Sequence, residues 1–121
     1  MKKILIIGSG AMGAAFSIPL IENNHKVTLS EPYNLKLLKK LSVKKKFHHA
    51  LKINLPKKLV IQKFSSDILY FKWDLIVIAV SSIGIDSIGK YLKNFKKTTP
   101  VLVLTKGLKL DKNKIITMTE Q

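Results

Sequence analysis

Ile4-Leu5-Ile6-Ile7-Gly8-Ser9-Gly10-Ala11-Met12-Gly13 joins an unbroken apolar run to a glycine-rich turn. An apolar run that does not alternate with polar residues is typical of a strand buried on both faces. The residues that follow, 14–21, have helical length and a broad apolar face. The pattern therefore predicts a turn between a buried strand and a helix.

Each glycine has an expected role in this turn. Gly8 would supply the tight turn, Gly10 would let the backbone approach a pyrophosphate, and Gly13 would let the helix pack closely on the sheet. The anion would rest on N–H groups at the helix N-terminus, where the helix dipole favours negative charge. We therefore expect dinucleotide contacts from Gly8, Ser9, Gly10, Ala11, Met12 and Gly13.

An acidic residue at the end of the next strand strengthens this prediction. The expected strand 26–31 ends in Glu31, eighteen residues beyond Gly13. A separation near ~20 residues is expected when a carboxylate accepts hydrogen bonds from the adenosine ribose hydroxyls. A carboxylate there would repel the extra phosphate of NADP, which favours NAD as the cofactor. The alternative is that Glu31 is a solvated residue at a strand end.

Composition bounds the class of protein. The 121 residues are 46% hydrophobic and 24% charged, which is typical of a single globular domain, here residues 1–121. No apolar run approaches the ~20 residues that span a bilayer, and the start lacks a signal-peptide pattern. Without cysteine, disulfides and thiolate metal sites are excluded. We expect a cytoplasmic protein with no membrane partner.

The formal net charge of +15 invites a comparison with nucleic-acid-binding proteins. All 22 cationic side chains are lysine, however, and a nucleic-acid site is expected to use arginine for bidentate contacts. Together with the abundant Ile and Leu, the lysines suggest a composition bias of the source genome. We expect solvated lysines and no nucleic-acid partner.

The middle of the chain carries two expected helices and a loop. The first helix, 11–23, should kink or end near residues 15–18, because Pro19 falls beyond its first turn. The second, 32–46, should begin with Pro32 in its first turn and end in solvated lysines. In the loop 47–58, the adjacent His48 and His49 have no further His or Cys to support a metal site, so a loop role is expected.

Three more strands are expected, at 59–64, 75–80 and 101–104. The run 75–80 is unbroken and apolar, as in a central parallel strand covered on both faces. Strands that alternate with helices predict an α/β fold. We expect a Rossmann-type, doubly wound, mostly parallel sheet in a three-layer αβα arrangement.

Polar residues follow two of these strands at the carboxyl edge, where doubly wound sheets place ligands. Ser81 and Ser82 follow the strand 75–80 and would either cap the next helix or line a cofactor cleft. Lys106, after the strand 101–104, would neutralise a phosphate, polarise a carbonyl or remain one more surface lysine.

In this order, the segments resemble the first domain of NAD(P)-dependent glycerol-3-phosphate dehydrogenases over essentially the whole chain. The matching segments are G-S-G-A-M-G, H-K-V-T-L, I-N-L-P-K-K-L-V-I, D-L-I-V-I-A-V-S-S and T-K-G-L. The most specific is Thr105-Lys106-Gly107-Leu108. Ketopantoate reductases share the first half but typically differ at that last motif.

The resemblance implies an oxidoreductase that transfers a hydride between NAD(H) and the central carbon of dihydroxyacetone phosphate, giving sn-glycerol 3-phosphate, in glycerol-3-phosphate metabolism and phospholipid biosynthesis. It implies cofactor contacts from Glu31, Val80, Ser81 and Lys106, with Lys106 also contacting the substrate. The family's proton-transfer lysine would lie beyond Gln121, in a helical second domain. A separate domain or subunit is therefore an expected partner, and the seam where it would pack leaves room for a homo-oligomer.

Two other functions stay open on the sequence. The first is a non-enzymatic or degenerate nucleotide-binding module, which would bind the cofactor without a complementing domain. The second is a reductase of another substrate, such as ketopantoate.

Overall fold

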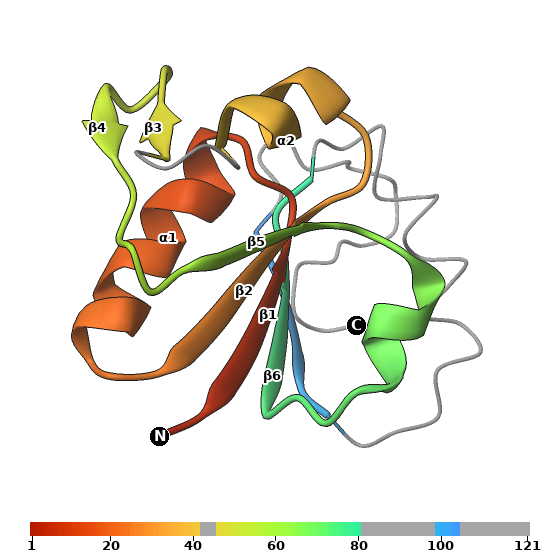
Figure 1. Cartoon of the computed structure of the whole chain (residues 1–121). Coiled ribbons are helices and arrows are strands. Elements are labelled where there is room, and N and C mark those ends of the chain that lie inside the picture. The colour runs from red at the N-terminus through yellow and green to blue at the C-terminus, as the bar shows by residue number, and fades with distance from the viewer. Residues whose placement is uncertain (42–45, 81–98, 105–121) are drawn as a thin grey trace, which may run out of the picture.

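A computed structural model describes residues 1–41, 46–80 and 99–104 of the chain. Within these ranges, parallel strands form one five-stranded sheet in the order β5-β2-β1-β6-β7 (Figure 1). The strands are β1 (Lys3–Ile7), β2 (Lys26–Glu31), β5 (Val60–Lys63), β6 (Leu75–Ile78) and β7 (Val101–Val103). The chain first builds outward from β1 through β2 and β5, and then returns to β6 on the other side of β1. This is the doubly wound topology that the sequence predicted.

Helical segments cover both faces of the sheet. Helices α1 (Ala11–Glu22) and α2 (Leu35–Leu41) lie on one face, and the short 3₁₀ helix η1 (Ser66–Tyr70) lies on the other (Figure 1). Strand β1 contributes side chains to the cores on both faces, because alternate side chains of a strand point to opposite faces. Ile4 and Ile6 pack with the α1 and α2 core, while Leu5 and Ile7 pack with the η1 core. The described residues thus form the predicted three layers.

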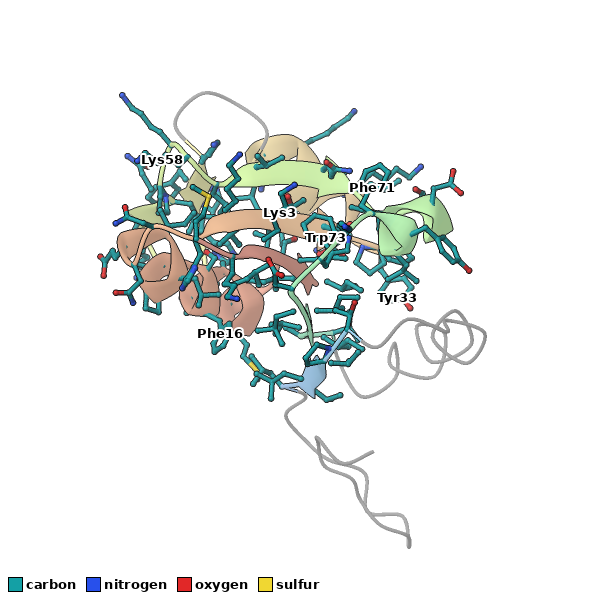
Figure 2. The ribbon with its side chains drawn as sticks, turned by 90° about the horizontal axis from the view of Figure 1, so that it is seen from below. Lys3, Phe16, Tyr33, Lys58, Phe71 and Trp73 are labelled. Carbon is teal, nitrogen blue, oxygen red and sulfur yellow. The ribbon has the colours of Figure 1, made fainter. Side chains whose placement is uncertain are left out.

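Aromatic residues complete these two cores. Phe16 of α1 packs against the core on the α1 face, and Trp73, just before β6, packs against the core on the η1 face (Figure 2). The Trp73 indole Nε1 donates a hydrogen bond of 2.7 Å to the Ile68 carbonyl of η1. This bond fixes η1 to the segment that leads into the sheet.

Helix α1 is continuous through Pro19 to Glu22, so the predicted early end near residues 15–18 was wrong. Proline removes the hydrogen bond to the carbonyl of the residue four positions earlier, which is Ala15 here. Both Pro19 and Ala15 lie on the exposed side of the helix. The Ala15 carbonyl therefore has access to water, which compensates for the lost bond.

Helix α2 begins later than the sequence predicted. It starts at Leu35, because the Asn34 side chain caps it by accepting a hydrogen bond of 2.9 Å from the Leu37 amide. Pro32 therefore precedes the cap instead of occupying the first turn. The helix ends at Leu41, and residues 42–45, which the prediction placed in it, lie outside the described residues.

The expected loop 47–58 contains a short antiparallel hairpin, β3 (Phe47–His48) with β4 (Ile53–Asn54). Lys46, predicted at a solvated helix end, instead ties this hairpin to the segment before β5. Its Nζ donates hydrogen bonds to the carbonyls of Lys57 at 2.7 Å and Leu59 at 2.5 Å. Figure 1 shows the hairpin beside α1 and α2. In the described ranges, neither of the α-helices nor η1 is long and apolar enough to cross a membrane.

Candidate functional site

The glycine turn lies at the carboxyl edge of the sheet, between the ends of β2 and β6. Backbone hydrogen bonds hold its beginning on both sides: the Gly8 amide donates to the Ser30 carbonyl at 2.7 Å, and the Ala79 amide donates to the Ile7 carbonyl at 2.8 Å. This is the point where the strand order reverses, and open α/β sheets bind ligands in the crevice there.

The three glycines have different surroundings. Gly8 has a φ of +113°, and a Cβ atom there would lie 2.5 Å from the Ala79 carbonyl oxygen. A Cβ at Gly13 would overlap the Gly8 carbonyl oxygen, so both positions need glycine for close packing. A Cβ at Gly10 would meet no atom of the described residues within 4 Å. Gly10 therefore faces open space at the carboxyl edge, as expected of a position that a ligand approaches.

Helix α1 presents its N-terminus at this open space. Gly10 is its N-cap, no side chain in the described part of the chain caps it, and its first turn holds no acidic residue. Ala11 and Met12 are exposed there, whereas Ser9 is fully buried. A 12-residue helix whose first N–H groups lack a side-chain cap suits an anion.

Glu31, the last residue of β2, is 5% exposed, so it is not a solvated residue at a strand end. Its Oε1 accepts hydrogen bonds from the Ser9 amide at 2.8 Å and the Ser9 hydroxyl at 2.5 Å. Its Oε2 accepts from the amides of Tyr33 and Asn34, both at 2.8 Å. Burial alone would raise the pKa of this carboxyl, but the four hydrogen bonds outweigh burial and hold its pKa below the ordinary value.

His48 is part of the same cluster, which the sequence did not reveal. Its side chain is 1% exposed, and its Nε2 lies 2.8 Å from the Ser9 carbonyl oxygen. The sequence held no periodic signal for this contact, because β3 and β4 have only two residues each. The exposed neighbour His49 contacts Phe47 instead, with ring centroids 5.0 Å apart. The described residues contain no group of three or more side chains that could hold a metal ion.

The other predicted site residues fall partly outside the described ranges. Val80 is buried two residues after the end of β6, and its amide nitrogen lies 3.2 Å from where a Gly8 Cβ would be, so it borders the glycine turn. Ser81, Ser82 and Lys106 lie outside the described residues. The structure thus brings together the glycine turn, Glu31 and Val80, and adds His48.

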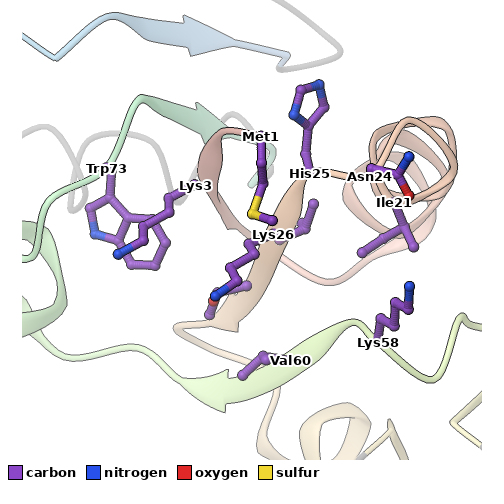
Figure 3. A pocket seen from close by; sticks show the side chains of 11 residues that line it. Met1, Lys3, Ile21, Asn24, His25, Lys26, Lys58, Val60 and Trp73 are labelled. Carbon is purple, nitrogen blue, oxygen red and sulfur yellow. The ribbon is translucent and has the colours of Figure 1, made fainter.

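A separate hollow of about 710 Å³ lies at the opposite edge of the sheet (Figure 3). Lys3, Lys26 and Val60, the first residues of β1, β2 and β5, line it together with Trp73. It is therefore at the amino edge, remote from the glycine turn. We assign the candidate site to the carboxyl edge, where the glycine turn and helix dipole meet.

A doubly wound parallel sheet with a glycine turn and a helix N-terminus at its switch point defines a Rossmann-type dinucleotide-binding domain. Comparison with known families agrees. Residues 3–120 match the model described as "NAD-dependent glycerol-3-phosphate dehydrogenase N-terminus". The chain belongs to this family of oxidoreductases and corresponds to its N-terminal domain.

Individual proteins give the same result. Over 119 residues the chain is 33% identical to "Glycerol-3-phosphate dehydrogenase [NAD(P)+]" of Fusobacterium nucleatum, covering 97% of this chain and 35% of that protein. It is 24% identical over 118 residues to "NADP(+)-dependent glycerol-3-phosphate dehydrogenase" of Archaeoglobus fulgidus, with the same shares covered. The crystal structure of glycerol-3-phosphate dehydrogenase from Coxiella burnetii has the same fold, with a TM-score of 0.74, 22% identity, and coverage of 88% of this chain and 33% of that one. The chain therefore spans about a third of the length of the relatives it matches.

Proposed function

We propose that this chain binds the cofactor of a glycerol-3-phosphate dehydrogenase that interconverts dihydroxyacetone phosphate and sn-glycerol 3-phosphate. One observation carries the proposal: in a chain of this family, Gly10 opens onto free space at the uncapped N-terminus of α1. The pyrophosphate would bind to the N–H groups of that first turn, where the positive end of the helix dipole attracts its negative charge.

The chain's own residues would hold and orient the dinucleotide. The nicotinamide supplies or accepts the hydride when it is bound. Val80 borders the glycine turn. We propose that Ser81 and Lys106 also contact the cofactor, and that Lys106 contacts the substrate as well. Proton transfer to the substrate would come from the part of the family's length that this chain does not span.

Glu31 supports NAD over NADP in this proposal. Its lowered pKa keeps the carboxylate ionised at neutral pH, so it would repel a 2′-phosphate on the adenosine ribose. Ribose hydroxyls would share or replace hydrogen bonds that Ser9, Tyr33 and Asn34 now donate. The names of the relatives include both NAD(P)+ and NADP+. The proposed preference for NAD therefore rests on Glu31 and not on the comparisons.

The variant Gly10→Ala should weaken cofactor binding with little effect on folding stability. The added methyl meets open space in the free protein, so the melting temperature should change by only a few degrees. The same methyl would occupy the approach of the pyrophosphate, and we expect the Kd for NADH to rise about tenfold or more, which corresponds to ~1.4 kcal/mol. Calorimetric titration of NADH and NADPH into both chains measures this.

Gly8→Ala is the contrasting variant for this experiment. Its methyl would strike the Ala79 carbonyl in a left-handed backbone conformation, so this variant should lose stability first. Unchanged NADH affinity in a folded Gly10→Ala chain would contradict the proposed site. Tighter binding of NADPH than of NADH by the original chain would contradict the NAD preference proposed from Glu31.

A further inference from the structure

Ser9 is the most constrained residue of the glycine turn. It is fully buried, and three of its polar groups have partners within the chain. Its amide and hydroxyl both donate to Oε1 of Glu31, and its carbonyl oxygen lies 2.8 Å from Nε2 of His48. Glu31 comes from β2 and His48 from the β3–β4 hairpin, so two segments distant in sequence meet on one residue of the turn.

The hydrogen bond between His48 and Ser9 runs from the ring to the backbone. A carbonyl oxygen can only accept, so Nε2 of His48 is the donor. The Leu51 amide lies 3.4 Å from Nδ1 and donates to it, which is consistent with a proton on Nε2. The hairpin holds the His48 backbone, because the Lys52 amide donates to the His48 carbonyl at 2.7 Å and His48 pairs with Ile53.

The Ser9 carbonyl controls the direction of the next N–H group. The Ser9 C=O and the Gly10 N–H belong to one planar, trans peptide unit and point in opposite directions. A hydrogen bond that holds the carbonyl towards His48 therefore also aims the Gly10 N–H. Such a restraint matters at this position, because glycine has more backbone freedom than any other residue.

We propose that His48 is a positioning residue of the cofactor site, which acts with Glu31 to hold Ser9 and so presets the N–H groups of the glycine turn for a pyrophosphate. This inference rests on the proposed function, since it takes the dinucleotide as the ligand. A preset turn loses less conformational freedom when it binds, so the hydrogen bond contributes to affinity without touching the ligand.

The adjacent histidines allow a matched experiment on the full chain. His48→Phe fills the same space without a donor, His48→Gln keeps a side-chain N–H, and His49→Phe is the exposed control. For His48→Phe we expect the Kd for NADH to rise about tenfold, the equivalent of one lost hydrogen bond. His48→Gln should remain within about threefold of the original chain, and His49→Phe should be unchanged. His48→Phe binding as tightly as the original, or His48→Gln as weakly as His48→Phe, would overturn the proposal.

A measurement on the unaltered chain remains informative if a variant fails to fold. Nitrogen-15 NMR of the imidazole should show His48 with its proton on Nε2 and that proton protected from exchange with water. A proton on Nδ1, or rapid exchange, would overturn the proposed hydrogen bond. If the original chain binds no NADH but shows this NMR signature, the proposed function fails while the hydrogen bond from His48 to Ser9 stands.

Discussion

Glu31 is a buried carboxylate, and its protonation in acid should destabilise the folded chain. Its pKa is lower in the folded chain than the ordinary value of 4.5, because hydrogen bonds to the carboxylate outweigh the effect of burial. The folded state therefore binds this proton less readily than the unfolded state does. The resulting stabilisation is complete above the ordinary value and is lost as the pH falls through the folded pKa. The free energy of unfolding should decrease as the pH is lowered from about 5 towards 3.

Glu31→Gln tests this assignment by denaturant unfolding across that pH range. An amide cannot accept four hydrogen bonds and brings an NH₂ group against backbone donors, so we expect a loss of about 2–3 kcal/mol at neutral pH. The variant should also show a shallower loss of stability in acid. Glu22→Gln, at an exposed position on α1, is the control and should keep the acid dependence of the original chain. An equally steep acid dependence in Glu31→Gln would show that another group is responsible.

For individual residues, the sequence predicted their places in the strand-turn-helix motif better than it predicted their hydrogen-bond partners. Gly8, Gly13 and Glu31 were found by spacing, because a strand-turn-helix unit has a characteristic length. The four donors to Glu31 were not predictable, since they depend on how residues 32–34 turn after β2. His48 was missed for a related reason: its burial comes from a tertiary contact and not from a local pattern.

At the scale of elements, Pro19 shows tertiary packing overriding a local rule. Apolar residues of α1 on both sides of the proline pack on the sheet core, including Phe16, Ile18 and Leu20. This packing keeps the helix intact at the cost of a hydrogen bond at Ala15. Pro19→Ala restores the bond and improves helix propensity, so we expect the free energy of unfolding to rise by about 1–3 kcal/mol.

Pro32→Ala is the matched control for Pro19→Ala in urea unfolding. Pro32 lies outside both α-helices of the described ranges, so its replacement restores no helical hydrogen bond and adds flexibility to the unfolded chain. We expect this variant to be equal to the original or less stable by up to ~1 kcal/mol. If Pro19→Ala were no more stable than the original chain, water at Ala15 would compensate fully for the missing bond.

The difference between local sequence patterns and tertiary contacts also explains which helices and strands were predictable. The strands found by unbroken apolar runs, β1 and β6, lie side by side in the sheet. Helix α2 was placed too early because both Pro32 and Asn34 are good helix-start residues, and only the structure shows that the Asn34 side chain makes the cap. The hairpin's two-residue strands were too short to produce any alternation.

For the whole molecule, the topology followed from simple rules. Parallel strands joined through helices, with the first strand near the centre, place the glycine turn, Glu31 and Val80 at one edge. The sequence could therefore predict that the residues of the candidate site gather at one edge before any contact was known. It could not predict that Glu31 and His48 are engaged with Ser9, and this engagement limits the chemistry available there.

Cofactor binding and turnover should therefore separate in this chain. Hydride transfer to the ketone carbon of dihydroxyacetone phosphate leaves an alkoxide that requires a proton. Among the described residues, the ionisable side chains that contact Ser9 of the glycine turn are Glu31 and His48. Both are buried and use their polar atoms within the chain, so neither is placed to supply that proton. We expect the 121 residues to bind NADH without oxidising it when dihydroxyacetone phosphate is added, as followed by NADH absorbance. Coxiella burnetii glycerol-3-phosphate dehydrogenase, which shares the fold, is the positive control for the assay. Substrate-dependent oxidation by the chain alone would contradict this expectation, and Lys106 would then be the first residue to replace.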